Sequence, residues 1–107
     1  MDTKTWIKIA SVTDIDAVMP FLVTMNNRDV ALYQVNNTVY ATDDTCSHAD
    51  ASLCEGEYHG YIVTCPRHGG QFDIRSGQAV KIPAVSPIQV FPVRVEDGDV
   101  YLSPDDV

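Results

Sequence analysis

The sequence has 107 residues, of which 45% are hydrophobic and 21% are charged, as is typical of one ordinary globular domain. Seven Lys and Arg residues stand against 15 Asp and Glu residues, and a net charge of −8 disfavours binding to nucleic acids or to anionic membranes. No apolar run approaches the roughly 20 residues that cross a bilayer, and the first residues resemble no export signal, so we expect a cytoplasmic protein.

Short apolar runs separated by turn-forming residues predict an all-β domain. In the first part of the chain the expected strands are 6–10, 21–25, 30–35 and 38–42, with a turn at 26–29. The last two of these strands flank Asn36 and Asn37, whose side chains tolerate a positive φ. This pair therefore predicts a tight hairpin.

The pattern changes in the middle of the chain. From Asp43 to Gly60 the apolar alternation disappears, and Cys, His, Ser, Asp, Glu and Gly accumulate in a loop that is long for a compact domain. Short strands are then expected at 61–64, 71–74 and 78–82, with a second irregular loop at 65–70 and a turn at 75–77. Residues from about 43 to 82 therefore resemble an insertion within a β-framework, all in a single domain over 1–107.

The C-terminal part returns to a regular pattern. Residues 88–95 and 100–102 are expected to be strands that pair through a turn at Asp97 and Gly98. Pro92 lies within the first of them, and because proline has no N–H to donate, it indicates an edge position.

Both irregular loops carry a cysteine close to a histidine. Cys46 and His48 are separated by one residue, Cys65 and His68 by two, and sixteen residues lie between the two pairs. An odd number of cysteines without an export signal argues against a disulfide framework and favours metal binding or a free thiol. The Cys-x-His spacing is short for a structural zinc site. Two thiolates on one iron and two imidazoles on its neighbour suit a two-iron cluster better.

At this point the sequence resembles the Rieske family, whose pattern is Cys-x-His, about sixteen residues, then Cys-x-x-His. The resemblance continues through Gly69-Gly70-Gln71-Phe72-Asp73, Ser76-Gly77 and Pro83-Ala84. It implies a Rieske-type antiparallel β-sandwich with an inserted cluster-binding subdomain. It also implies one [2Fe–2S] cluster, with Cys46 and Cys65 on the inner iron and His48 and His68 on the outer iron.

The same resemblance bears on the redox potential. Replacing two thiolates by neutral imidazoles makes an added electron less repelled, which raises the potential into a range of about −150 to +300 mV. High-potential members of the family carry a disulfide where this chain has Ala51 and Arg67, and hydroxyl donors where it has Gly70 and Phe72. We therefore expect a potential near the bottom of that range.

Other reactive residues have simpler interpretations. Cys54 is expected to be a small, partly buried apolar residue and His59 a surface residue. Acidic residues crowd the first loop, where they form a solvated face or, for some of them, a docking surface; they are Asp43, Asp44, Asp50, Glu55 and Glu57.

Function follows from the resemblance and from two absences in the sequence. Once His48 and His68 are assigned, only His59 is left for a mononuclear iron site, and no G-x-G-x-x-G motif is present to bind a dinucleotide. We therefore expect that the protein is not an enzyme but a monomeric carrier of single electrons. The resemblance implies that it passes electrons from a flavin-dependent reductase to a terminal ring-hydroxylating oxygenase. Both partners are expected to dock transiently near His48 and His68. The alternatives are a small Rieske-type subunit of a nitrite-reductase-like complex and a zinc-stabilised β interaction module.

Overall fold

The computed structural model describes residues 4–46, 51–67, 69–82, 84 and 86–107. Strands dominate these residues, with two short 3-10 helices among them. In chain order the elements are β1 (Ile7–Ser11), η1 (Val12–Asp14), β2 (Phe21–Met25), β3 (Arg28–Val35), β4 (Thr38–Asp43), η2 (Leu53–Glu55), β5 (Glu57–His59), β6 (Ile62–Thr64), β7 (Gln71–Asp73), β8 (Ala79–Lys81), β9 (Val90–Phe91), β10 (Arg94–Glu96) and β11 (Asp99–Leu102). Within the described ranges, no helix is long and apolar enough to span a membrane.

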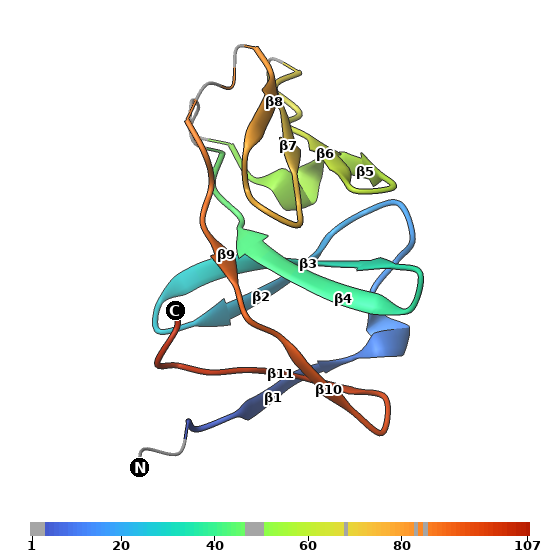
Figure 1. The fold of residues 1–107 in the computed structure, drawn as a ribbon, viewed down its shortest axis with the longest axis vertical. Coiled ribbons are helices and arrows are strands. Elements are labelled where there is room, and N and C mark those ends of the chain that lie inside the picture. Colours follow the sequence, from blue (N-terminus) through green and yellow to red (C-terminus); the bar gives the residue numbers. More distant parts are fainter. Residues whose placement is uncertain (1–3, 47–50, 68, 83, 85) are drawn as a thin grey trace.

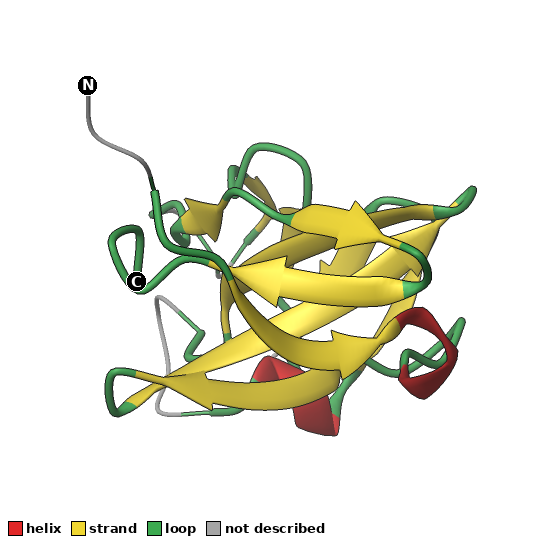
Figure 2. Cartoon of the chain, turned by 90° about the horizontal axis from the view of Figure 1, so that it is seen from below, coloured by secondary structure: helices red, strands yellow, loops and turns green. Residues whose placement is uncertain are grey.

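The strands form three antiparallel sheets, in the orders β1-β11-β10, β2-β3-β4-β9 and β5-β6-β7-β8. We call the first two sheets the framework and the third the upper sheet, because it lies above the framework in Figure 1. Seen from below, strands fill most of the view and the helical turns lie at one side (Figure 2). The predicted all-β antiparallel fold is confirmed.

Strand β3 contributes to two separate hydrophobic cores. Side chains alternate between the two faces of a strand, and here both faces are buried. Val30 and Leu32 belong to the framework core, whereas Ala31 and Tyr33 belong to a second core under the upper sheet. The β2-β3-β4-β9 sheet therefore forms a middle layer between the other two (Figure 1).

Two-residue turns set the register of the framework hairpins. Asn36 and Asn37 have φ values of 51° and 64°, and Val35 pairs with Thr38 across them, so the predicted hairpin is confirmed. Asp97 and Gly98, with φ values of 51° and 79°, join β10 to β11 as expected. The predicted turn at 26–29 is too long, because only Asn26 and Asn27 turn and β3 begins at Arg28.

Two predicted segments differ from the structure. The loop expected from Asp43 to Gly60 contains η2 and the strand β5, in which only Tyr58 is buried. A strand with one buried residue shows too little alternation to be recognised in a sequence. The single strand expected at 88–95 is split at Pro92 into β9 and β10, which are edge strands of different sheets. Proline cannot continue a ladder of hydrogen bonds, so the chain changes sheet there.

Several hydrogen bonds fasten the upper sheet to neighbouring parts of the chain. The Tyr58 hydroxyl donates to the Asp16 carbonyl (2.5 Å) and accepts from the Gln34 amide (3.0 Å). On the other side, the Gly77 carbonyl accepts from the Ile88 amide (2.8 Å). A Cβ at Gly77 would lie 2.0 Å from the Ile88 carbonyl oxygen, and its φ is +80°, so only glycine fits this contact.

Candidate metal centre

The first predicted ligand lies just beyond the end of β4. Cys46 is buried, and its amide donates to the Ala51 carbonyl (2.9 Å). One step earlier, Thr45 and Ser52 form an isolated β-bridge. The chain that leaves the framework at Cys46 therefore comes back to it at Ala51. The predicted ligand His48 lies outside the described residues.

The second predicted ligand follows β6 in the upper sheet. Cys65 is fully buried, its amide donates to the Gly70 carbonyl (2.7 Å), and its carbonyl accepts from the Gly69 amide (3.1 Å). Gly69 has a φ of +77°, a conformation that glycine adopts without strain. The predicted ligand His68 also lies outside the described residues.

Both cysteines belong to the same hydrophobic core, the one beneath the upper sheet. Neither forms a disulfide. Two cysteine side chains, brought from two loops into one apolar core, suit a soft or borderline metal such as iron or zinc. Among the described residues, to which His48 and His68 do not belong, no group of three or more His, Cys, Asp or Glu side chains could hold a metal ion. The two predicted cysteine ligands therefore lie in one core, and their chemistry suits a metal cluster.

The third cysteine has different surroundings. Cys54 is half-buried at the edge of this core, as the sequence predicted. Burial raises the pKa of its thiol well above the ordinary value, and a hydrogen bond to the Asp44 carboxylate raises the pKa further. Metals bind the thiolate, so a thiol that stays protonated is a poor ligand.

The acidic residues of the first loop do not form one surface. Asp44 is buried, which excludes it from any docking surface. Asp43 makes a bidentate ion pair with Arg28 (2.8 and 2.7 Å), which holds its carboxylate against the framework. Glu55 and Glu57 are exposed and stay available to a partner. Asp50 lies outside the described residues.

His59 is exposed, as expected, and lies 3.6 Å from the Glu57 carboxylate.

The positions that distinguish high-potential Rieske proteins lie near the candidate site. Ala51 and Arg67, at which those proteins carry their disulfide, line the same surface hollow of about 290 Å³. Phe72 is fully buried in the core that holds both cysteines.

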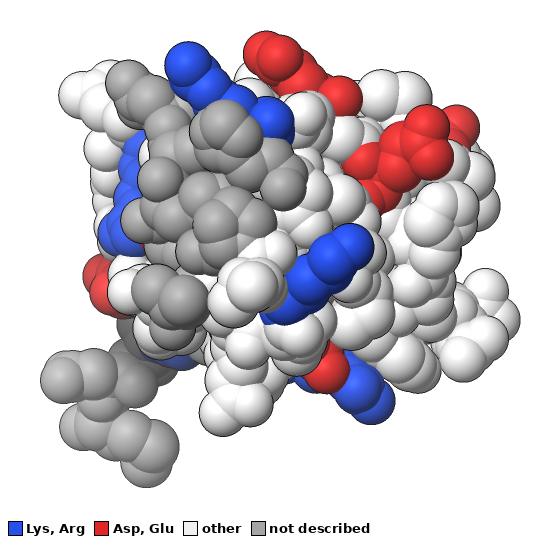
Figure 3. Space-filling model, turned by 90° about the horizontal axis from the view of Figure 1, so that it is seen from above, with Lys and Arg blue, Asp and Glu red and all other residues white. Residues whose placement is uncertain are grey.

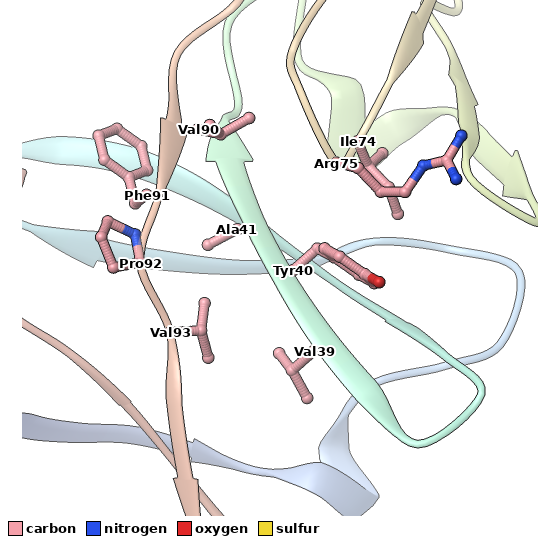
Figure 4. Close-up of a pocket in the computed structure, with 9 residues that line it drawn as sticks. All are labelled: Val39, Tyr40, Ala41, Ile74, Arg75, Val90, Phe91, Pro92 and Val93. Carbon is pink, nitrogen blue, oxygen red and sulfur yellow. The ribbon is translucent and has the colours of Figure 1, made fainter.

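A larger hollow of about 380 Å³ lies between β4, the chain around β9 and the residues Ile74 and Arg75 that follow β7 (Figure 4). Between β4 and the chain that follows β9, the hollow is lined by apolar side chains, including Val39, Ala41 and Val93. Ladder pairing between β4 and β9 stops at Ala41 and Phe91, because Pro92 follows. No cysteine lines this hollow, so it is separate from the candidate metal centre.

Comparison with known proteins identifies the family. Residues 5–92 match the family described as Rieske [2Fe-2S] domain. The chain belongs to the Rieske family. Ferredoxin CarAc of Metapseudomonas resinovorans is 37% identical to this Rieske domain over 102 residues, a match that covers 92% of each chain. Other relatives, at about 35% identity, are named ferredoxin components of naphthalene 1,2-dioxygenase systems.

Solved structures agree with this assignment. The Sphingomonas yanoikuyae B1 ferredoxin superposes with a TM-score of 0.86 at 35% identity, covering 94% of this chain and 98% of that one. A chain from the complex of reduced oxygenase and oxidized ferredoxin in carbazole 1,9a-dioxygenase gives a TM-score of 0.87 at 34% identity, covering 98% of each chain. The expected resemblance to the Rieske family is confirmed, and the relatives are ferredoxin components of dioxygenase systems.

The sequence reasoning missed one residue of the site. The sequence predicts that Asp44 belongs to a solvated face or a docking surface, yet it is buried and bonded to the segment that follows the first ligand loop. A sequence signal existed, because an Asp beside a polar loop often accepts bonds from nearby backbone amides. The pattern could not show which amides those are.

Proposed function

We propose that this Rieske protein is a one-electron carrier whose [2Fe–2S] cluster is held by Cys46, His48, Cys65 and His68. The observation that carries the proposal is the pair of buried cysteines outside any disulfide, each in a loop closed by its own backbone hydrogen bond and both in one core. When bound, such a cluster takes up and releases a single electron. Residues from about 43 to 82 would form the cluster-binding subdomain.

The described residues give the site its environment. Cys46 and Cys65 are at most 3% exposed, and the side chains around them are mostly apolar, so water is kept from the thiolate side. We propose that the two histidines, carried by the same two loops, provide the more accessible side. Electrons would then enter and leave at His48 and His68.

Relatives named ferredoxin components of dioxygenase systems point to the partners. We propose a flavin-dependent reductase as electron donor and a terminal ring-hydroxylating oxygenase as acceptor, each docking transiently. The same relatives favour this role over a fixed subunit of a nitrite-reductase-like complex. A monomeric state and a cytoplasmic location stay predictions.

Charge is distributed unevenly over the end of the molecule that carries the upper sheet. In Figure 3 the main group of acidic side chains lies on one side of this face, and basic side chains border other parts of it. Among the described acids of the first loop, Glu55 and Glu57 are exposed. We propose that they attract a basic surface of at least one partner and so raise the rate of encounter.

The cluster is tested by analysing the purified protein for iron, acid-labile sulfide and its visible spectrum. We expect two irons and two sulfides per chain, as one [2Fe–2S] cluster requires. A colourless zinc protein would contradict the proposal and favour the interaction module.

Docking is tested by stopped-flow electron transfer with a reductase and an oxygenase of the dioxygenase class. We expect the rate to fall as salt rises from about 10 to 300 mM, since the screening length shortens from about 30 Å to below 10 Å. Glu55→Lys should slow transfer more than Asp105→Lys, a control at the C-terminal end of the chain. Rates that ignore both salt and Glu55→Lys would mean that docking is apolar.

A further inference from the structure

Asp44 is the one charged residue among the buried polar residues that the structure describes, and it is 3% exposed. It lies two positions before Cys46. Burying a carboxylate costs free energy unless hydrogen bonds replace its water. Its partners should therefore explain why a charge is placed there.

Those partners lie on the chain that returns from the first ligand loop. The Asp44 carboxylate accepts from the Cys54 amide at Oδ1 (2.9 Å) and from the Ser52 hydroxyl at Oδ2 (2.5 Å). Its backbone carbonyl accepts from the Leu53 amide (2.7 Å), and its amide donates to the Asp29 carbonyl in β3 (3.1 Å). One residue thus binds three consecutive residues of the return segment and ties them to the framework.

The bonds continue in order toward the ligand loop. After Asp44, Thr45 bridges to Ser52, and the Cys46 amide bonds to the Ala51 carbonyl. Every described residue from Asp44 to Cys46 is therefore paired with the returning chain. If the pairing at Asp44 were lost, the next two pairs would lose the contact that aligns them.

We propose that Asp44 is a positioning residue of the first ligand loop: its carboxylate fixes the Ser52–Cys54 segment and thereby the place from which Cys46 reaches the cluster. This inference rests on the proposed function, since it takes Cys46 to be a ligand. Groups that hold ligands in place are known to tune metal sites without touching the metal.

The surroundings of Cys54 support this role. The same carboxylate accepts from the Cys54 amide (2.9 Å), and it adds to the effect of burial in raising the pKa of the Cys54 thiol. The one cysteine outside the predicted ligand pairs is thus kept as a thiol beside the segment that Asp44 holds.

The second ligand loop provides an internal contrast. There, the flanking residues Thr64 and Gln71 are joined by a bond between two neutral side chains, from the Gln71 amide to the Thr64 hydroxyl (3.0 Å). Both residues are half-buried. Only the first loop, within the described residues, depends on a buried charge.

The test compares Asp44→Ala with three other variants. Asp44→Asn retains an oxygen for the Cys54 amide and an NH₂ that can donate to the Ser52 hydroxyl. Ser52→Ala removes one partner of the carboxylate. Asp43→Ala is the matched control, because it removes a neighbouring carboxylate that bonds to Arg28 and not to the return segment. Each protein is measured as purified, by hydrogen exchange of residues 51–55 and by the electron paramagnetic resonance of the reduced state.

We expect Asp44→Ala to speed exchange at Leu53 and Cys54 by roughly tenfold or more, because their amides lose a buried acceptor or its support. Its resonance spectrum should also change. Asp44→Asn should rescue both properties, Ser52→Ala should show a smaller change in exchange, and Asp43→Ala should match the wild type in both.

Two results would overturn the inference. One is wild-type exchange and spectrum in Asp44→Ala, and the other is an Asp43→Ala variant that reproduces the changes. If Asp44→Ala does not fold, Ser52→Ala decides, since unchanged exchange at Leu53 and Cys54 in that variant would contradict the proposal. A wild-type protein without iron and sulfide would refute the proposed function, whereas the exchange experiment would still report on the loop.

Discussion

The framework and the upper sheet differ in the length over which their strands pair. β3 and β4 pair over six residue positions from a two-residue turn, so the framework ladder is long and its register is fixed. Each strand of the upper sheet has three residues. Such short strands are marginal on their own. The upper sheet therefore depends on tertiary bonds and, in our proposal, on the cluster that its loops hold.

The two hydrophobic cores differ in the kinds of side chain that they contain. The framework core consists of aliphatic side chains, Met25 and Phe91. The core beneath the upper sheet contains both predicted thiol ligands, together with Tyr33 and Tyr58, whose rings meet edge to face at 5.1 Å. Polar atoms in this second core need specific partners, and Tyr33 finds one in the Thr42 hydroxyl (2.8 Å). The core of the region proposed to carry out electron transfer thus depends on particular hydrogen bonds in addition to apolar contacts.

The largest effect should come from removing a thiol of the cysteine pair. Cys46→Ser or Cys65→Ser should abolish the native visible spectrum, because a hydroxyl does not replace a buried thiolate on iron. Cys54→Ser should leave the spectrum unchanged. Visible absorption and iron content of the three variants check this, and a Cys46 or Cys65 variant with the wild-type spectrum would contradict the assignment.

The next prediction compares truncations of two adjacent β3 residues, each of which belongs to a different core. Leu32→Ala and Tyr33→Ala should each lower the free energy of unfolding by roughly 3 kcal/mol, because each truncates a fully buried side chain. Only Tyr33→Ala changes the core that contains the cysteines. We expect it to speed the loss of visible absorption under native conditions, while Leu32→Ala does not. Equal rates of loss would mean that the cores are not independent.

A smaller effect concerns the redox potential, which we expect near −150 mV, at about the bottom of the Rieske range. Phe72→Tyr adds a hydroxyl donor within the cysteine core and should raise the potential. A hydrogen bond of roughly 1.4 kcal/mol to the reduced state corresponds to roughly 59 mV for one electron. Phe91→Tyr, in the framework core, is the control, and voltammetry is the measurement. An equal shift in both variants would exclude a local hydrogen bond.

The smallest effect is a pH dependence at Cys54. The folded chain holds this proton more tightly than the unfolded chain, because burial and Asp44 raise the thiol pKa. The resulting stability is therefore present at neutral pH and is lost as pH rises above about 8.5, the ordinary thiol value. Wild type and Cys54→Ser should show diverging free energies of unfolding above that pH. Parallel curves up to about pH 10 would show that the folded-state pKa is not raised.

The reactivity of Cys54 gives a second measurement of the same property. An exposed thiol reacts with iodoacetamide at a rate that levels off above about pH 9.5, once it is ionised. The rate for Cys54 should be slower and should still be rising at that pH. Mass spectrometry of the modified protein measures this rate, and a plateau at the ordinary pH would contradict the prediction.

The sequence by itself determined the features that depend on neighbouring residues. Asn36 and Asn37 adopt positive φ values because their own side chains tolerate them, so the hairpin was predictable. The two Cys and His pairs were visible for the same reason, since each pair lies within a single loop. The alternation of β3 indicated a strand, although it could not indicate that both faces would be covered.

Only the tertiary structure decided the features that depend on contacts between distant segments. It placed Val30 and Tyr33 in different cores, because two other sheets pack against the two faces of the middle layer. It moved the chain from one sheet to another at Pro92. It also buried Asp44, whose carboxylate bonds to residues eight and ten positions later. A charged residue in a polar loop looks solvated until the chain that covers it and donates hydrogen bonds to it is in place.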